Sequence, residues 1–416
     1  MKLLPWLACA VLGVLAFFLK FMVPGYSFSA LVCLLLIALM LLCCSAFAEE
    51  DDWTLEGALS EIDPSFAADI FIDVDEAVDV DAPAVESIYE ADGSILITIT
   101  AAGDFTVGGD SRKSSNIWDT ELKKHGGDYQ FAMKNIRDVL LADDLTIINF
   151  EGTLTESTYI PSSKKNNDFL FSAPPEYVNM LTENGIEAVA LDNNHTMDHG
   201  EEAYAETQSH LSNAGIVWSG GGELGVIEVK GVQIAMLSYL CIDRYEQLWD
   251  TVPADIQAAK ALYPIVIVNF HWGNEKWYYP TDNQIKMGRL AVDSGADLVL
   301  GHHSHRIQPI EQYKGVYICY SLGNFCFAGN SKPSDMTSYL FQTRFRIREG
   351  ENGQEISNEG FIIIPIRISS RADKNDFIPT VLTKESTIDS ILNTLKENGR
   401  KHCEYAVEEY PLAWEE

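Results

Sequence analysis

The sequence is poor in basic residues. Only 29 Lys and Arg stand against 61 Asp and Glu, which gives the 416-residue chain a formal net charge of -32. Half of this excess lies between Glu49 and Asp92, where 16 acidic residues occur without any Lys or Arg. Such a stretch repels polyanions, and the charge pattern therefore argues against nucleic acid as a partner.

Cysteine is present, but its spacing indicates no structural role. Of the eight cysteines, four lie in the apolar N-terminal region, and the others are Cys241, Cys319, Cys326 and Cys403. None of them forms a CxxC or zinc-finger spacing, so the sequence predicts neither a disulfide framework nor a cysteine-ligated zinc. One bridge among the last four is compatible with the sequence, which does not place it.

The first 48 residues contain two long apolar runs, residues 3–19 and 28–48. Each is close to the ~20 residues that a helix needs to cross a bilayer. Pro24 and Gly25 separate the runs, which fits a hairpin of two membrane helices. Ala46-Phe47-Ala48 also has the small-x-small form of a cleavage site, so a long export signal is the alternative. We favour a retained membrane segment over residues 1–48, because that length is unusual for a simple signal.

Residues 49–93 have the composition of a solvated acidic linker without sustained periodicity. Because an acidic run fits an exported segment better than a cytoplasmic one, we expect a protein of the cell membrane whose catalytic domain is extracellular. From Ser94 onward, apolar runs alternate with segments of helical spacing, which predicts an α/β domain. Helices are expected over residues 129–142, 175–184, 200–213, 283–294 and 386–398, a hairpin over 225–240, and added strands over 338–347 and 360–369.

Nearly every apolar strand of this domain ends in a polar cluster. The clusters are Gly103-Asp104, Asn149-Phe150-Glu151, Asn193-Asn194-His195, His271, and Gly301 to His305. In open α/β sheets, ligands bind outside the carboxyl ends of the strands, so these clusters are expected to gather at one edge.

Carboxylates, carboxamides and imidazoles without a thiolate suit Zn, Mn or Fe as ligand atoms. Enough donors are present for one or two ions, and an ion pair at ~3.5–4 Å polarises a phosphoryl or acyl oxygen and activates water. Taken singly, each residue has an ordinary explanation: Asp104 as a turn residue, His195 as a buried histidine. Only the sequence GHHSH at 301–305 favours metal binding by itself. Five polar clusters at the ends of strands in one domain are, however, poorly explained by an ordinary role for each residue.

The same stretches carry a resemblance to a known family. They read GDFTVGGD, NFEGTL, NNHTMDHG, HWGNE, SGADLVLGHHSHRIQPIE and YSLGNF, and they lie within residues 95–327. They resemble the CapA family of capsule-synthesis and poly-γ-glutamate biosynthesis proteins, which is related to calcineurin-like metallophosphoesterases. The resemblance implies a four-layer α/β/β/α sandwich with its catalytic domain at 94–330, completed by strands and a helix from 331–416.

The resemblance also implies roles for individual residues. The implied metal ligands are Asp104, Glu151, Asn194, His271, His303 and His305, with Glu151 in the bridging position. His195 is the implied general acid, and supporting roles fall to His302, Asp198, Glu275 and Asn324. Thr106 departs from the pattern, because metallophosphoesterases usually carry a histidine there. The number of divalent ions, one or two, therefore stays open.

We expect a membrane-anchored, metal-dependent hydrolase or transferase that acts in the synthesis, anchoring or release of an extracellular anionic polymer, together with other capsule-synthesis membrane proteins. An acidic protein repels such a polymer unless metals or basic residues offset its charge, and Arg244, Lys276, Arg289 and Arg306 are candidates for this. One alternative is an extracytoplasmic phosphoesterase acting on nucleotides or wall components. Another is a non-catalytic component of a membrane assembly.

Overall fold

The computed structural model describes residues 88–113, 116–165, 169–350 and 353–415. Residues Glu86–Glu416 form one compact unit. The predicted membrane segment (1–48) and nearly all of the predicted linker (49–93) lie outside the described residues. Within the part that is described, no helix combines the length and apolar character needed to span a bilayer.

The first large sheet has the order β17-β16-β15-β1-β3-β6-β7, and β14 also pairs with β1. Its parallel strands are β1 (Ile95–Thr106), β3 (Leu145–Phe150), β6 (Ala188–Ala190), β7 (Val217–Ser219) and β14 (Asn324–Phe327). Its antiparallel strands are β15 (Thr337–Gly350), β16 (Gly353–Arg367) and β17 (Thr380–Val381). The C-terminal part of the chain thus extends the sheet that begins with β1.

The second large sheet has the order β12-β13-β11-β10-β9-β8. Its strands are β8 (Gly225–Val229), β9 (Val232–Leu240), β10 (Ile265–His271), β11 (Leu298–His302), β12 (Ile310–Tyr313) and β13 (Val316–Cys319). The predicted hairpin is β8-β9, with Lys230 and Gly231 at its turn in the left-handed region. A small sheet joins β2 (Gly109–Asp110), β5 (Phe171–Ala173) and β4 (Thr153–Leu154).

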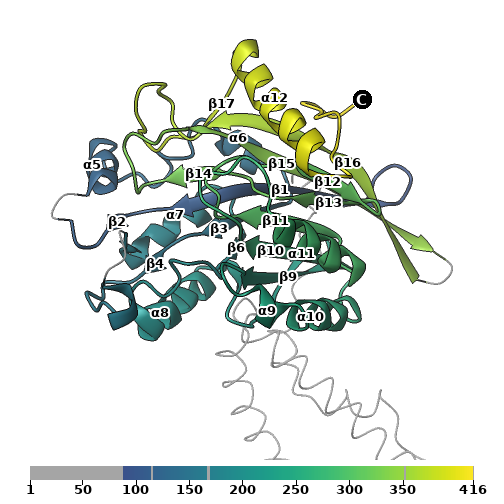
Figure 1. Ribbon diagram of the computed structural model, residues 1–416, viewed down its shortest axis with the longest axis horizontal. Helices are drawn as coiled ribbons and strands as arrows, with labels where there is room; N and C mark the ends of the chain where they lie inside the picture. Colours follow the sequence, from purple (N-terminus) through teal and green to yellow (C-terminus); the bar gives the residue numbers. More distant parts are fainter. Residues whose placement is uncertain (1–87, 114–115, 166–168, 351–352, 416) are drawn as a thin grey trace, which may run out of the picture. The chain divides into compact units, whose positions relative to one another are not determined.

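The helices surround these sheets (Figure 1). They are α5 (Ile117–Lys124), α6 (Arg137–Leu140), α7 (Asn179–Thr182), α8 (Gly200–Asn213), α9 (Tyr245–Leu248), α10 (Thr251–Lys260), α11 (Asp282–Asp293) and α12 (Glu385–His402), with the 3-10 turns η1 (Ser162–Lys164) and η2 (Pro175–Val178). The helices expected over 200–213, 283–294 and 386–398 are confirmed within a few residues, and the stretch 175–184 is divided between η2 and α7.

The helix expected over residues 129–142 is wrong for most of its length. Only Arg137–Leu140 is α-helical, and the preceding residues form successive turns. Their backbone hydrogen bonds span three residues, as from Met133 N to Gln130 O and from Ile136 N to Met133 O. Phe131, Met133, Ile136 and Leu140 of this segment are nevertheless buried. The apolar spacing therefore identified most of the buried positions, although the segment is not a regular helix.

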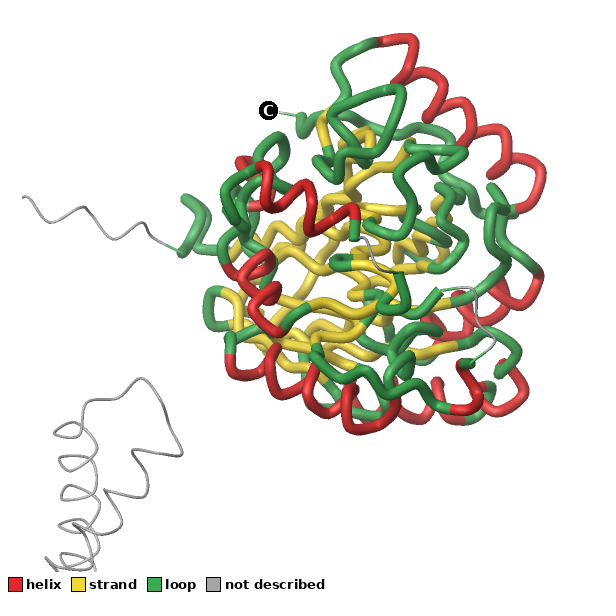
Figure 2. Tube along the Cα trace, turned by 90° about the vertical axis from the view of Figure 1, so that its left-hand side faces the viewer, coloured by secondary structure: helices red, strands yellow, loops and turns green. Residues whose placement is uncertain are grey.

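Three apolar clusters hold the unit together. The middle cluster joins inward-facing residues of both large sheets, such as Ile97 of β1 and Ile267 of β10. A second cluster packs α5 to α8 against the other face of the first sheet, and a third packs α10 and α11 against the second sheet. Figure 2 shows the strands stacked inside a rim of helices. The result is a mixed α/β architecture, as predicted. The cysteines at 241, 319, 326 and 403 are buried and unpaired, so no bridge joins them.

The sequence predicts that an apolar strand ends at the cluster Gly103-Asp104, and the structure corrects this boundary. β1 continues through it to Thr106, and the pairing of β1 with β3 and β14 shifts register around Asp104. Asp104 N donates to Gly323 O at 2.9 Å, and a Cβ on Gly103 would lie 1.9 Å from that same oxygen. Glycine at 103 is therefore required for the backbones to approach, and this approach fixes the position of Asp104.

Candidate metal centre

The predicted residues meet at the carboxyl ends of the parallel strands. Asp104 lies on β1, Glu151 follows β3, Asn194 and His195 follow β6, His271 ends β10, and His303 and His305 follow β11. The strand registers bring the clusters together, because Asp104 pairs with Asn149 across β1 and β3, and His271 pairs with His302 across β10 and β11. The convergence expected from the sequence is thus present in the fold.

Glu151 lies at the middle of this group and is buried. Its Oε1 atom is 3.8 Å from Nε2 of His195, 4.0 Å from Nε2 of His271 and 3.9 Å from Nε2 of His305. These separations are too long for hydrogen bonds. Neither carboxylate oxygen of Glu151 accepts a hydrogen bond from any described residue. A buried ionised carboxylate without donors is costly, and a bound cation would offset that cost.

The donor set fits a divalent metal ion. Ligand bonds of roughly 2.0–2.2 Å place two atoms on one tetrahedral ion about 3.4 Å apart, and wider angles place them further apart. The carboxylate–imidazole separations around Glu151 are near this value. Ligand atoms of Asp104, Glu151 and His305 also lie within 4.8 Å of one another, as do those of Glu275, His303 and His305. The residues present therefore suit a divalent ion, and the two groups share His305.

Hydrogen bonds orient His305 toward Glu151. Its Nδ1 lies 2.9 Å from Asn324 Oδ1 and 3.0 Å from Asp104 Oδ2, which leaves Nε2 facing Glu151. Asp104 also accepts a hydrogen bond at 2.8 Å from Asn149 Nδ2. Asn324, predicted to support the centre, therefore does contact a predicted ligand.

His271 and Asn194 form a second contact in the centre. Nε2 of His271 lies 2.6 Å from Asn194 Oδ1, and Nδ1 lies 3.3 Å from Asn149 Nδ2. The imidazole of His303 packs against His271 with ring centroids 4.7 Å apart. Nδ1 of His303 is buried and has no hydrogen-bond partner among the described residues.

His195 has a carboxylate partner outside the set of predicted metal ligands. Its Nδ1 lies 2.7 Å from Asp198 Oδ2, which also accepts from Phe171 N at 2.8 Å. Lys164 Nζ donates to the other oxygen of Asp198 at 2.8 Å. Asp198 is fully buried and held from three sides, so it fixes the ring of His195 with Nε2 toward Glu151.

The loop after β11 has an unusual backbone. His303 and His305 have φ values of 90° and 51°, in the region that favours glycine. A Cβ on Gly301 would lie 2.1 Å from Tyr320 O and 2.6 Å from Trp272 Nε1, so the strand requires glycine just before the histidines. A strained backbone persists only where the surrounding structure fixes it, and such residues cluster at functional sites.

Burial and neighbouring charges set the pKa values of the carboxylates in the centre. Burial raises the pKa of Glu151 to about 7. Burial also opposes ionisation of Asp104, yet the hydrogen bond and charge of His305 hold its pKa below the usual value. For His305, burial disfavours the charged form, but the carboxylates of Glu151 and Asp104 raise its pKa to about 10.

Three further imidazoles of the centre, those of His271, His302 and His303, favour their neutral form. Burial lowers the pKa of His302 to about 4 and that of His303 to about 4, and it lowers the pKa of His271 well below the usual value. Neutral imidazole is the form that binds metal ions. The lowered pKa values therefore keep these three imidazoles in the form that can bind a metal ion.

Some contacts of the centre were missed from the sequence. Asn149 and Asn193 hydrogen-bond to each other at 3.3 Å and link the ends of β3 and β6. Both were visible within the polar clusters, but carboxamides are ordinary in turns. Lys164 gave no signal at all. His302, expected only to support, has Nδ1 3.7 Å from Asp104 Oδ1, and neither ring nitrogen has a partner among the described residues. Thr106 Oγ1 is likewise buried without a partner there.

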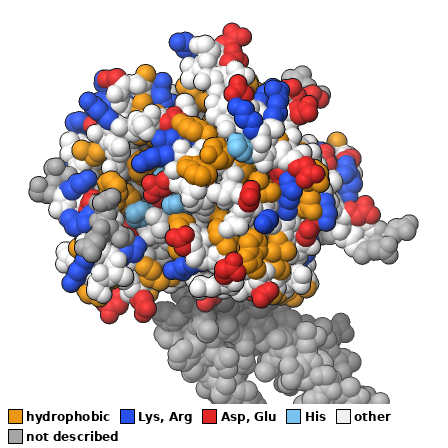
Figure 3. Space-filling model, in the orientation of Figure 1, with side chains coloured by type: hydrophobic (Ala, Val, Ile, Leu, Met, Phe, Trp, Pro, Cys, Tyr) orange, Lys and Arg blue, Asp and Glu red, His pale blue; other side chains and the backbone are white. Residues whose placement is uncertain are grey.

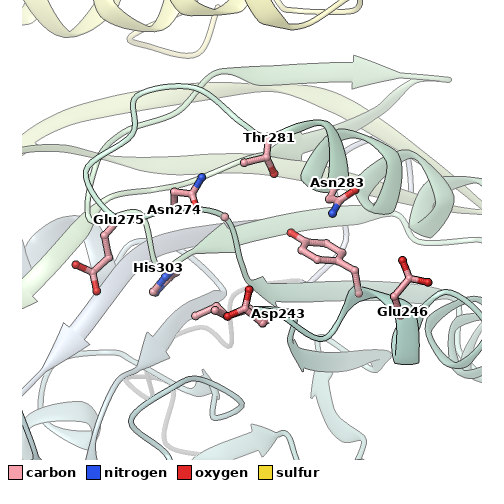
Figure 4. Close-up of a pocket in the computed structure, with 10 residues that line it drawn as sticks. Asp243, Glu246, Asn274, Glu275, Thr281, Asn283 and His303 are labelled. Atoms are coloured by element: carbon pink, nitrogen blue, oxygen red, sulfur yellow. The ribbon is translucent and has the colours of Figure 1, made fainter. Parts of the chain in front are cut away.

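Hollows adjoin the centre on several sides. One of about 470 Å³ is lined by His303, Glu275, Asp243 and Glu246. Figure 4 shows His303 and Glu275 at one end, Glu246 at the other, and Asp243 between them. Another, of about 580 Å³, is lined by Asn194, Lys164 and Arg244. Histidine side chains reach the surface on the face shown in Figure 3. Substrate-sized groups therefore have access to the centre.

Residues 98–329 match the family described as bacterial capsule synthesis protein PGA_cap. The chain belongs to this family. Capsule biosynthesis protein CapA of Bacillus anthracis is 29% identical over 302 residues, which cover 67% of this chain and 69% of that protein. PGA biosynthesis protein CapA of Bacillus subtilis is 30% identical over 229 residues, which cover 50% of this chain and 58% of that protein. A probable polyglutamine synthesis accessory protein of Mycobacterium tuberculosis is 27% identical over 271 residues, 56% of this chain and 70% of that protein. The predicted membership of the CapA family is confirmed.

Proposed function

We propose that this CapA-family chain is a metal-dependent hydrolase or transferase in the synthesis, anchoring or release of an extracellular anionic polymer of the poly-γ-glutamate or capsule kind. The polymer class rests on the names of the relatives. The chemistry rests on one observation above the others. The buried Glu151 carboxylate has no hydrogen-bond donor among the described residues, and three imidazole nitrogens surround it at 3.8–4.0 Å.

Each residue of the centre has a proposed role. The proposed ligands of Mn, Zn or Fe are Asp104, Glu151, Asn194, His271, His303 and His305. A divalent ion bound there would polarise the acyl or phosphoryl oxygen of a substrate and lower the pKa of bound water. His195 would give the leaving group a proton from Nε2, because Asp198 holds its Nδ1. Asp198 is therefore a positioning residue for His195. Asn324 positions His305 in the same way, through its contact with Nδ1.

The surroundings of the domain are also part of the proposal. The two facing sheets with helices on their outer faces support the four-layer α/β/β/α sandwich of the metallophosphoesterases. We place the domain outside the cell, attached to the membrane through the apolar runs of residues 1–48 and working beside other membrane proteins of polymer synthesis.

Metal analysis of the full-length chain tests the chemistry. The protein is equilibrated with Mn²⁺, and free metal is then removed. Inductively coupled plasma mass spectrometry should then find one or two Mn²⁺ ions per wild-type chain. His303→Ala should retain fewer, and His210→Ala, on α8 away from the centre, should match wild type. Failure of wild type to retain metal would overturn the enzymatic proposal.

A paired activity assay separates the two substrate classes. Turnover of an oligo-γ-glutamate by the Mn²⁺-loaded chain, lost in His195→Ala, supports the polymer proposal. Turnover of p-nitrophenyl phosphate alone would favour the plain phosphoesterase. If polymer production in cells is unaffected by His195→Ala and His303→Ala, the chain acts as a non-catalytic component and the proposal fails.

A further inference from the structure

A hollow of about 190 Å³ opens directly beside the proposed general acid. Its wall includes His195 and His305, together with Asn324, which holds His305. A leaving group that takes a proton from His195 must lie on this side of the centre. The side chains that line the hollow therefore determine which leaving groups the centre accepts. This inference rests on the proposed function.

Two basic residues line this hollow. Lys276 follows β10, and its backbone N donates to Ser304 O at 2.7 Å, which ties it to the histidine loop. Its ammonium group forms no ion pair with any described residue. The side chain of Arg306 is 8% exposed and is fixed by Ser334 Oγ at 2.6 Å and by the carbonyl of His305. Asp335 lies 3.9 Å from Arg306 and offsets part of its charge.

Aromatic rings also line this hollow. The ring of Phe171 lies 4.5 Å from that of His195, and the ring of Phe327 lies 5.3 Å from that of His305. Phe169 stacks on Phe171 at 5.9 Å, and the Lys113 ammonium lies 5.4 Å from the centroid of Phe169. These rings can bury methylene groups, and the cations of Lys276 and Arg306 line the same hollow.

One carboxylate also lines the hollow. Glu275 lies with its ligand atom within 4.8 Å of those of His303 and His305, so it belongs to the side of the metal centre. The hollow thus has two basic side chains and one acidic side chain in its lining, in a chain whose net charge is -32. Of the four basic residues proposed from the sequence to offset this charge, Lys276 and Arg306 line this hollow. Arg289 does not, because it pairs with Glu311 at 2.7 Å.

We propose that this hollow is the leaving-group subsite, and that Lys276 and Arg306 select a leaving group with a carboxylate next to its departing atom. The leaving unit of a γ-linked glutamate chain has this form: its nitrogen is bonded to the carbon that bears the α-carboxylate. In hydrolysis the C–N bond breaks and the oxygen of water forms the new C–O bond. The nitrogen gains two protons, one from His195 and one from water, so the products are a carboxylate and an ammonium group. The other proton of water restores His195.

Binding of two matched ligands tests the subsite without requiring turnover. The probes are a γ-linked glutamate trimer and the same trimer with its α-carboxylates amidated, titrated calorimetrically into the full-length, Mn²⁺-loaded chain. Wild type should bind the carboxylate form about tenfold more tightly, as expected for charge-assisted hydrogen bonds near a surface. Lys276→Gln should reduce this preference to about twofold. Lys286→Gln removes the same charge from the exposed side of α11 and should leave the preference unchanged.

The salt dependence provides a second measurement that does not depend on a variant. The preference of wild type for the carboxylate form should fall several-fold between about 50 mM and about 500 mM NaCl, because exposed charges are screened. Equal binding of the two trimers by wild type, or a full preference in Lys276→Gln, would overturn the subsite. A preserved preference without any turnover of either trimer would contradict the proposed chemistry and leave the subsite standing.

Discussion

Replacement of Glu151 by glutamine should have opposite effects on stability with and without metal. Burial raises the pKa of Glu151 to about 7, from an ordinary value of 4.5. Each pKa unit corresponds to about 1.36 kcal/mol, so without metal the ionised carboxylate destabilises the fold by up to about 3 kcal/mol at pH 8. The buried amide that the substitution introduces also needs partners, which leaves a net gain of about 2 kcal/mol for Glu151→Gln in the presence of a chelator.

The sign depends on pH. A carboxyl whose folded pKa is raised costs nothing below its unfolded pKa, and its cost grows as pH rises toward the folded pKa. The gain in Glu151→Gln should therefore appear at pH 8 and vanish near pH 4.5. For a unit of roughly 330 residues the unfolding entropy is about 0.7 kcal/mol/K, so about 2 kcal/mol raises Tm by about 3 °C.

Metal should reverse the ranking. Free Mn²⁺ at about a hundred times its Kd stabilises wild type by about 2.7 kcal/mol, or about 4 °C, and Glu151→Gln should lose most of this shift. Scanning calorimetry of both proteins, with chelator and with Mn²⁺, measures all four values. Glu187→Gln is the matched control, because this glutamate has a raised pKa but accepts a hydrogen bond from Thr146 N at 2.8 Å. Two results would refute the reasoning. One is a Tm of Glu151→Gln below that of wild type at pH 8 with chelator, and the other is a rise in Tm with Mn²⁺ equal to that of wild type.

Other changes have separate expected outcomes. Asp198→Asn should lower kcat about tenfold or more while Mn²⁺ content stays at the wild-type level, because it loses the charged hydrogen bond at 2.7 Å that positions His195; an unchanged kcat would contradict this. Burial raises the pKa of Asp143 to about 7, so Asp143→Asn should raise stability in urea by about 2 kcal/mol at pH 8 and not at pH 4. Gly103→Ala should cost more than about 3 kcal/mol, since its Cβ would lie 1.9 Å from Gly323 O, and near-wild-type unfolding would show that the backbones can separate.

The sequence predicted the parts of the fold that depend on local pattern. Apolar runs ending in polar clusters identified the strands that carry the centre, because burial of a parallel strand removes polar residues along its whole length. The helix over 200–213 was recovered because its buried residues, such as Ala203, Thr207 and Leu211, recur at helical spacing. The segment 129–142 was wrong because its spacing records which residues are buried, and successive turns bury the same residues.

The contacts that hold the centre in place were less predictable. Asn149 meets Asp104 across 45 residues of chain, and Lys164 meets Asp198 across 34, and neither pair has a local signature. The continuation of β1 through Asp104 depends on the approach of Gly323 to Gly103, which only the folded chain brings about. The ends of the predicted strands identify the candidate metal ligands. Their hydrogen-bond partners depend on tertiary packing, which the sequence pattern does not reveal.

The central claim is that Glu151 and the surrounding imidazoles hold a divalent cation. Anomalous diffraction from crystals of the full-length chain grown with Mn²⁺ tests it most directly. We predict a peak at the manganese edge within about 2.3 Å of Glu151 Oε1 and of the imidazole nitrogens of His271 and His305. A crystal with Mn²⁺ in the medium and no anomalous peak between these residues would contradict the account.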